Sequence, residues 1–158
     1  MRLSVQTDYA LRTLMYLAAH EGHHSIAQIA RQYRISKNHL MKVAQRLAAE
    51  GFVDSVKGRS GGLLLAQPAE SINVGHVVRT FEDYGAFVQC FPEADDSCVV
   101  TPVCGLRHVL ADGIDAFLRH LDGYTLADIV GDKARFISVW QGSGPTPTSR
   151  NISNIVGD

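Results

Sequence analysis

The chain has 158 residues, of which 46% are hydrophobic and 20% are charged, and its formal net charge is −1. This length allows one domain of ordinary size, or one domain with an appendage, and the apolar residues are enough to form a core. No apolar run approaches the roughly 20 residues that span a bilayer, and Gln6 and Asp8 interrupt the region where a signal peptide needs its apolar centre. We therefore expect a cytoplasmic protein.

The small net charge conceals an asymmetry along the chain. Residues 1–66 contain nine Lys or Arg and four acids, whereas residues 67–158 contain six basic and twelve acidic residues. One explanation is that surface charges are unevenly distributed along the chain without any functional reason. A basic half of this kind also attracts a polyanion such as nucleic acid.

Three helices are predicted in the first 50 residues. Apolar residues at helical spacing predict the first over about residues 8–20. The second begins at Ser25, whose spacing from Gln28 is that of a capping box. A tight turn at residues 34–35 follows, and Ser36 then caps the third helix.

A β-hairpin and two further helices are predicted after residue 51. Residues 52–56 and 63–65 are short apolar strands around a Gly-rich basic loop. Asn73 caps a fourth helix, and a long helix with a wide apolar stripe follows the last cysteine. From residue 142 onward the chain is rich in Gly, Ser, Pro, Thr and Asn, and we expect a disordered tail.

This order of elements is typical of a winged helix-turn-helix, so the predicted fold is mainly α with a small β-hairpin wing and a long additional helix. In such folds the second helix of the pair enters the major groove of DNA and its N-terminal residues reach base edges. Seven basic residues and two acids lie between Arg31 and Gly62. The residues expected to contact DNA are Gln28, Ser36, Lys37, Asn38, His39, Lys42, Arg46, Lys57 and Arg59.

Chemistry assigns different roles within this set. Asn38 suits a bidentate contact with adenine, and the Ser36 hydroxyl suits a phosphate. The glycines around Arg59 would let the hairpin tip approach the duplex, where an Arg enters a narrow minor groove. The alternative is an ordinary amphipathic helix with a solvated polar face.

The chain's three cysteines, Cys90, Cys98 and Cys104, all lie within fifteen residues. An odd number cannot pair completely, and a reducing cytoplasm disfavours disulfides. The gaps of seven and five residues are longer than those usual in structural zinc sites and differ from common ferredoxin spacings. Soft thiolates on so long a loop favour an iron–sulfur cluster. A DNA-binding protein with a structural zinc site and a cluster-bearing electron carrier are the competing hypotheses.

Several motifs together resemble the Rrf2 family of bacterial winged-helix regulators over residues 1–132. They are Met1-Arg2-Leu3, Thr7-Asp8-Tyr9-Ala10-Leu11-Arg12, Ser36-Lys37-Asn38-His39-Leu40-Met41-Lys42, Gly58-Arg59-Ser60-Gly61-Gly62, the three cysteines, and Leu121-Asp122-Gly123-Tyr124-Thr125-Leu126-Ala127-Asp128. Within the family the chain most resembles the nitric-oxide-sensing repressors. This closer resemblance rests on three features: Asn38-His39 beside Met41-Lys42, the run Val88-Gln89-Cys90, and the acid at position 8.

The resemblance implies a homodimer that is built on the long helix and binds a palindromic operator in double-stranded DNA. It implies a 4Fe–4S cluster, in preference to a 2Fe–2S cluster, which nitric oxide nitrosylates or removes. Cys90, Cys98 and Cys104 would be three ligands, and Asp8 of the partner subunit the fourth. Arg12, one helical turn after Asp8, would pair with it or with the cluster loop.

Two other branches of the family remain as alternatives. Iron-responsive repressors share the cysteine spacing but lack the acid at position 8. Cluster-status regulators use a His three residues after the third cysteine, where this chain has Arg107, with His108 one residue late. We find no nucleophile elbow, phosphate loop or metal-hydrolase motif, and we expect no enzymatic activity.

These observations predict four parts of the chain. Residues 1–82 would form the DNA-binding domain and residues 83–104 the cluster loop. Residues 105–132 would hold the dimerisation helix and a short following helix, and residues 133–158 a tail that is disordered at its end.

Overall fold

The structure, a computed structural model, describes residues 2–58, 61–85, 87–91, 94 and 97–142. The helices are α1 (Val5–Ala19), α2 (Ile26–Tyr33), α3 (Lys37–Ala49), α4 (Val74–Phe81), α5 (Leu106–Asp122), α6 (Leu126–Val130) and α7 (Lys133–Trp140). The strands are β1 (Val53–Val56) and β2 (Gly62–Leu65), and short 3-10 turns span Ala69–Ser71 and Thr101–Val103. Of the helices described, none is both long and apolar enough to cross a membrane. The predicted mainly helical fold with a two-stranded hairpin is confirmed.

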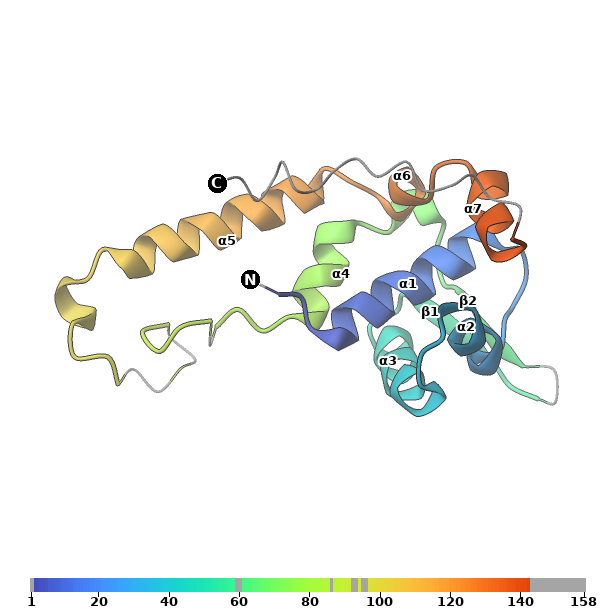
Figure 1. Cartoon of the computed structure of the whole chain (residues 1–158), viewed down its shortest axis with the longest axis horizontal. Helices are drawn as coiled ribbons and strands as arrows, with labels where there is room; N and C mark the ends of the chain where they lie inside the picture. The colour runs from blue at the N-terminus through green and yellow to red at the C-terminus, as the bar shows by residue number, and fades with distance from the viewer. Residues whose placement is uncertain (1, 59–60, 86, 92–93, 95–96, 143–158) are drawn as a thin grey trace.

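α1 runs through the main hydrophobic core and contacts α3, α4, α6 and α7 (Figure 1). It begins at Val5, earlier than predicted, because the Ser4 hydroxyl accepts a hydrogen bond from the Thr7 backbone N–H and caps the helix. Leu14, Ile29, Leu40 and Leu47 are fully buried and join α1, α2 and α3. The helix-turn-helix therefore folds around α1 as its centre.

Of the two serine caps predicted for α2 and α3, only the one at Ser25 forms its hydrogen bonds. The Ser25 hydroxyl accepts from the Gln28 N–H, while the Gln28 side chain accepts from the Ser25 N–H, which completes the capping box. α2 ends at Arg34, which adopts the left-handed conformation with φ 54°. Ser36 occupies the cap position of α3, but its side chain makes no capping hydrogen bond.

β1 and β2 pair antiparallel, with Val53 opposite Leu65 and Val56 opposite Gly62. The hairpin packs on the turn before α2, because the backbones of His24 and Leu63 exchange hydrogen bonds of 2.9 Å. A Cβ at Gly62 would lie 2.5 Å from the His24 carbonyl carbon, so this position requires glycine. The sequence had suggested that the glycines serve close approach to DNA, whereas Gly62 serves close packing within the protein.

α4 and α5 form a second, smaller core. Val78, Phe91, Ile114 and Leu118 are its buried residues. Arg79 donates to the Asp122 carboxylate at 2.5 and 2.7 Å and joins α4 to the end of α5. α5 extends away from the helix-turn-helix (Figure 1), and Val88, Cys90 and Phe91 from the segment between α4 and α5 pack beside it in this second core.

α7 was not predicted. Asp132 caps it by accepting from the Ala134 and Arg135 N–H groups, and Trp140 packs among Tyr16, Tyr33 and Phe136 with ring centroids 5.0–5.5 Å apart. The predicted tail thus starts with a helix that packs on α1. Its end, residues 143–158, lies outside the described residues.

Candidate functional site

The N-terminal half of α3 carries exposed polar side chains. Lys37, Asn38, His39 and Lys42 are all exposed, while Leu40 is buried. The amphipathic pattern explains this division, because positions three and four apart share a helical face. The hydroxyl of Ser36, also exposed, makes no bond to the helix end and is available to a ligand at that end.

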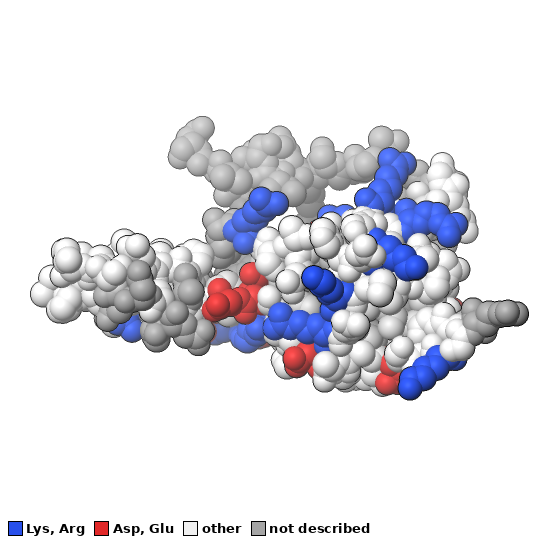
Figure 2. Space-filling view, turned by 90° about the horizontal axis from the view of Figure 1, so that it is seen from below, with Lys and Arg blue, Asp and Glu red and all other residues white. Residues whose placement is uncertain are grey.

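Basic side chains gather on the face to which α3 belongs. Figure 2, seen from below, shows Lys and Arg across this face of the helix-turn-helix with few acids among them. The exposed basic residues in α2, in α3 and directly after α2 and β1 are Arg31, Arg34, Lys37, Lys42, Arg46 and Lys57. Arg59 lies outside the described residues. A positive surface of this kind binds phosphate backbones.

Two of the expected DNA-contacting residues make contacts within the protein. The Gln28 amide oxygen accepts from the N–H and hydroxyl of Ser25, so this side chain serves as a helix cap. Arg46 donates from its guanidinium to the Thr80 carbonyl, and its Cζ lies 4.8 Å from the centre of the Phe81 ring. Arg46 therefore links α3 to α4, an arrangement that periodicity within α3 could not reveal.

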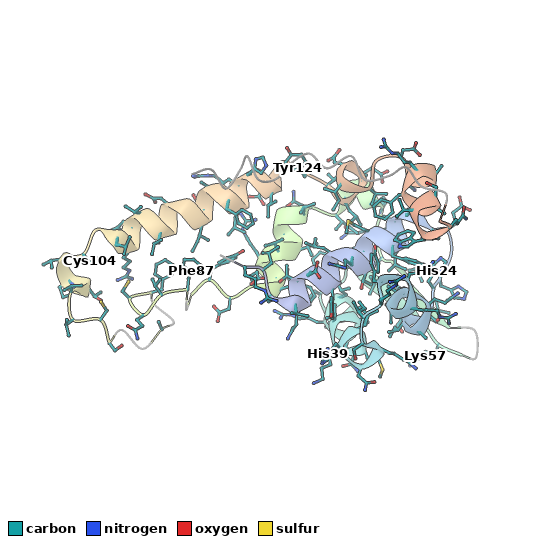
Figure 3. The ribbon with its side chains drawn as sticks, in the orientation of Figure 1. His24, His39, Lys57, Phe87, Cys104 and Tyr124 are labelled. Atoms are coloured by element: carbon teal, nitrogen blue, oxygen red, sulfur yellow. The ribbon has the colours of Figure 1, made fainter. Side chains whose placement is uncertain are left out.

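The three cysteines lie along the segment that joins α4 to α5. All three are free thiols of intermediate exposure. Cys90 packs in the second core, and the Cys98 carbonyl accepts from the N–H and hydroxyl of Thr101. Cys104 is separated from α5 by Gly105 alone. Among the residues described, no three Cys, His, Asp or Glu side chains converge to hold a single metal ion. Figure 3 shows Cys104 at the far end of α5, well away from His39 on α3.

Apolar side chains are exposed around the last two cysteines. Val99 and Val103 are 92% and 87% exposed, and Leu106 and Val109 at the start of α5 are 57% and 66% exposed. The long apolar stripe predicted for α5 is thus divided: Ile114 is buried and Leu110 packs on the second core, whereas Leu106 and Val109 are exposed.

Asp8 lies in the first turn of α1 and forms an ion pair with Arg12, with Oδ1 and Nε 2.9 Å apart. Of the two partners expected for Arg12, Asp8 and the cluster loop, the structure shows the pair with Asp8. The Arg12 guanidinium also lies over the Tyr33 ring, 5.7 Å from its centre. Burial raises the pKa of the Tyr33 hydroxyl, so the ring remains neutral beside this pair.

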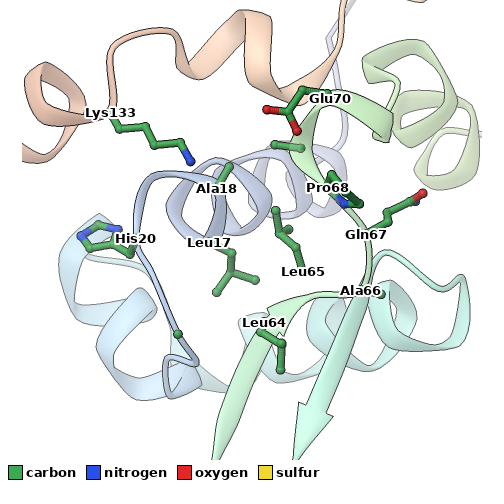
Figure 4. Close-up of a pocket in the computed structure, with 12 residues that line it drawn as sticks. Leu17, Ala18, His20, Leu64, Leu65, Ala66, Gln67, Pro68, Glu70 and Lys133 are labelled. Atoms are coloured by element: carbon green, nitrogen blue, oxygen red, sulfur yellow. The ribbon is translucent and has the colours of Figure 1, made fainter.

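An open pocket of about 500 Å³ lies on another side of the molecule (Figure 4). The side chains that surround it include Leu17 of α1, His20 directly after that helix, Leu65 of β2, Glu70 and Lys133. Its described lining includes no cysteine and no residue of α3. It is separate from both the basic face and the cysteine segment.

Comparison with known proteins identifies the family. Residues 3–132 match the Rrf2 model, described as an iron-dependent transcriptional regulator. The chain belongs to the Rrf2 family. The match ends directly before α7, so this helix lies outside the part that the family model describes.

Curated relatives within the Rrf2 family are HTH-type transcriptional regulators named NsrR. The protein of Bacillus subtilis is 49% identical over 84% of this chain and 92% of its own length. That of Geobacillus kaustophilus is 42% identical over 88% and 96%, respectively. The chain is therefore a DNA-binding transcription regulator, as the winged helix-turn-helix indicated.

Solved structures of Rrf2-type regulators have the same fold. CymR, the global cysteine regulator of B. subtilis, superposes with a TM-score of 0.64 at 26% identity, covering 82% of this chain and 96% of CymR. T. potens IscR superposes with a TM-score of 0.66 at 27% identity, covering 84% and 88%. These comparisons confirm the fold class that the order of helices and hairpin predicted.

Proposed function

We propose that the chain is a repressor that holds an iron–sulfur cluster on Cys90, Cys98 and Cys104 and releases its operator when nitric oxide destroys that cluster. One observation carries the proposal: three free, partly exposed thiols lie on a single segment between two packed helices of an Rrf2 regulator. The similarity to NsrR proteins supports nitric oxide as the signal. We infer no enzymatic activity.

The donor set fits such a cluster. Thiolate is the ligand that iron–sulfur clusters use, and none of these sulfurs is in a disulfide. Bound iron would supply the centre that reacts with nitric oxide. Cys90 would anchor one side against the second core, and Cys104 would anchor the other at the start of α5. Asp8 of a partner subunit is the proposed fourth ligand, which favours the 4Fe–4S form.

On this proposal the chain divides into a DNA-binding part at residues 1–82, a cluster loop at residues 83–104 and a dimerisation part at residues 105–132. Residues 133–158 follow, and α7 is the helical start of this last part. Lys37, Asn38, His39 and Lys42 would contact the major groove, while Lys57 and Arg59 would contact the duplex from the hairpin. A homodimer would place two such surfaces on a palindromic operator.

The test is an anaerobic titration of the purified protein with nitric oxide, following the cluster absorbance and binding to an operator duplex together. We expect both to be lost in proportion. Cys90→Ala, Cys98→Ala and Cys104→Ala should each abolish the chromophore and keep near-normal helical content, because the cysteines lie outside the main core. Full iron and sulfide in any of these variants would remove that cysteine from the ligand set.

The same experiment separates the alternatives. Loss of binding under an iron chelator but not under nitric oxide would favour an iron-responsive regulator, which agrees with the family description. A colourless protein that binds zinc would contradict the cluster, because zinc has no visible absorbance.

A further inference from the structure

The C-terminal end of α4 contacts both α3 and α1. Thr80, Phe81 and the following Glu82 make these contacts, and the chain passes from Glu82 directly into the segment that holds the cysteines. In Figure 1, α4 lies between α5 and the helix-turn-helix. Residues 83–104 are therefore joined to this end of α4 on one side and to the start of α5 on the other.

Arg46 joins this end of α4 to α3. Its guanidinium donates to the Thr80 carbonyl and lies over the ring of Phe81, which is only 5% exposed. The last carbonyls of a helix lack partners within the helix and attract a cation. Arg46 thus caps α4 from the last turn of α3, and it holds the proposed DNA-reading helix at a defined position.

Glu82 joins the same end of α4 to the start of α1. Its Oε1 accepts from the Ser4 backbone N–H at 2.6 Å and from the Thr7 hydroxyl, and Thr7 is fully buried. A carboxylate is also favoured at a helix N-terminus, where unpaired N–H groups concentrate positive charge. Asp8, the proposed ligand to the partner's cluster, is the next residue after Thr7.

α4 is also tied to α5. Asn73, which caps the start of α4, donates to the Asp122 carbonyl at 2.7 Å, and Arg79, in the last turn of α4, pairs with the Asp122 carboxylate. These contacts tie α4 to the C-terminal end of α5, away from the cysteines. α4 is therefore tied to α5 by Asn73 and Arg79, while its last residues and Glu82 link it to α3 and α1 at the end from which the cysteine segment leaves.

We infer that Arg46 and Glu82 are positioning residues that couple the cysteine segment to the DNA-binding helices through the end of α4. This inference rests on the proposed function and adds its route within one chain. Arg46 then acts on operator binding through the position of α3, and not as a phosphate contact. The two roles predict different behaviour on mutation.

The experiment compares Arg46→Ala, Arg46→Lys, Glu82→Ala and Glu82→Gln with Lys42→Ala, an exposed basic residue on the same helix. The probe is a duplex selected from random DNA by the wild-type protein. Affinity is measured for the cluster-bearing and the cluster-free full-length protein at several salt concentrations. The coupling is the ratio of these two affinities.

We expect Arg46→Ala and Glu82→Ala to reduce that ratio about tenfold while cluster absorbance and iron content stay normal. Arg46→Lys should not restore it, because an ammonium cannot both reach Thr80 and cover the Phe81 ring as a guanidinium does. Glu82→Gln keeps an acceptor oxygen and should retain most of the coupling. Lys42→Ala should weaken both states equally and lower the salt slope by about one, as the loss of a phosphate contact does.

Hydrogen exchange in the cluster-free protein gives a readout that does not involve DNA. Glu82→Ala should speed exchange of the amides of residues 4–8, because it removes the acceptor for Ser4 and Thr7. If Arg46→Ala behaves as Lys42→Ala does, or if Glu82→Ala changes neither the ratio nor the exchange, the positioning role is wrong. A wild-type ratio of one would instead overturn the proposed function, and the exchange result alone would then decide whether Glu82 holds α1.

Discussion

At the scale of single residues, Asp8 connects the ion pair seen in the structure with the proposed cluster. Asp8→Ala removes both the pair with Arg12 and the proposed ligand, whereas Arg12→Ala removes the pair and leaves the carboxylate. We expect Asp8→Ala to change the cluster absorbance and its sensitivity to nitric oxide, and Asp8→Cys to slow nitrosylation by supplying a stronger ligand. Arg12→Ala should keep the wild-type spectrum.

The cluster absorbance and its sensitivity to nitric oxide are measured by absorbance titration together with operator binding. If Asp8→Ala and Asp8→Cys both behave as wild type, Asp8 is not a ligand. If Arg12→Ala reproduces Asp8→Ala, the ion pair and not the carboxylate ligand is responsible.

The pair between Arg79 and Asp122 predicts a pH dependence of stability. Hydrogen bonds from Arg79 hold the pKa of the Asp122 carboxyl below its ordinary value. Because the pKa is lower in the folded state, the pair stabilises the protein above about pH 4, and this contribution is lost as the pH falls through the folded-state value.

Asp122→Asn should therefore lower Tm slightly at pH 7 and make no difference in strong acid. Asp115→Asn is the control, because Asp115 pairs with Arg119 on a more exposed face of α5. Thermal unfolding across the pH range checks the prediction, and a Tm difference that persists in acid would contradict it.

At the scale of elements, the two serines at the starts of α2 and α3 occupy equivalent positions with different contacts. Ser25 completes a capping box, while Ser36 makes no side-chain capping bond. Ser25→Ala should cost about 1 kcal/mol of unfolding free energy, and Ser36→Ala should cost close to nothing. Ser36→Ala should instead weaken operator binding about fivefold through a lost phosphate contact.

Urea denaturation and gel-shift titration of the two variants test this contrast. Equal destabilisation by both substitutions would mean that Ser36 does cap α3. Unchanged operator affinity of Ser36→Ala would remove it from the DNA-binding surface.

α7 gives a second prediction at this scale. Trp140, the chain's single tryptophan, packs against Tyr16 and Tyr33 from α1 and α2. Trp140→Ala should destabilise the protein by about 1–3 kcal/mol, since the indole is only partly buried. Val139→Ala, at a position 60% exposed, should have little effect.

Chemical denaturation measures both variants, and in the wild type the fluorescence of Trp140 reports directly on α7. If fluorescence changes well before the helical signal is lost, α7 detaches before the core unfolds, and Trp140→Ala should then cost little.

At the scale of the whole molecule, the uncovered start of α5 is the surface on which we propose that two chains associate. Val109→Glu should dissociate the dimer and weaken operator binding, because the charge would have to be buried in the interface. Val139→Glu is a matched control, since the two valines are 66% and 60% exposed. Sedimentation velocity gives the oligomeric state. A Val109→Glu dimer as stable as wild type would move the interface elsewhere.

The sequence by itself determined the order of elements around the DNA-binding surface. Its capping residues, the period of its apolar positions and its Gly-rich turn are local signals, so Ser25, Asn73 and the hairpin were located without any knowledge of distant contacts. The clustering of three cysteines was equally visible, because it is a property of the chain and not of its folding.

Only the tertiary structure decided how side chains of ambiguous chemistry are used. Arg46 was expected to contact DNA because it lies on the polar face of α3. In the structure its guanidinium donates a hydrogen bond to the carbonyl of Thr80, 34 residues away. Glu82 carried no signal at all, since its partners Ser4 and Thr7 lie at the other end of the domain. α7 was missed because only eight residues form it and its stability comes from packing on α1. Long-range contacts bring such groups together, and local periodicity contains no information about them.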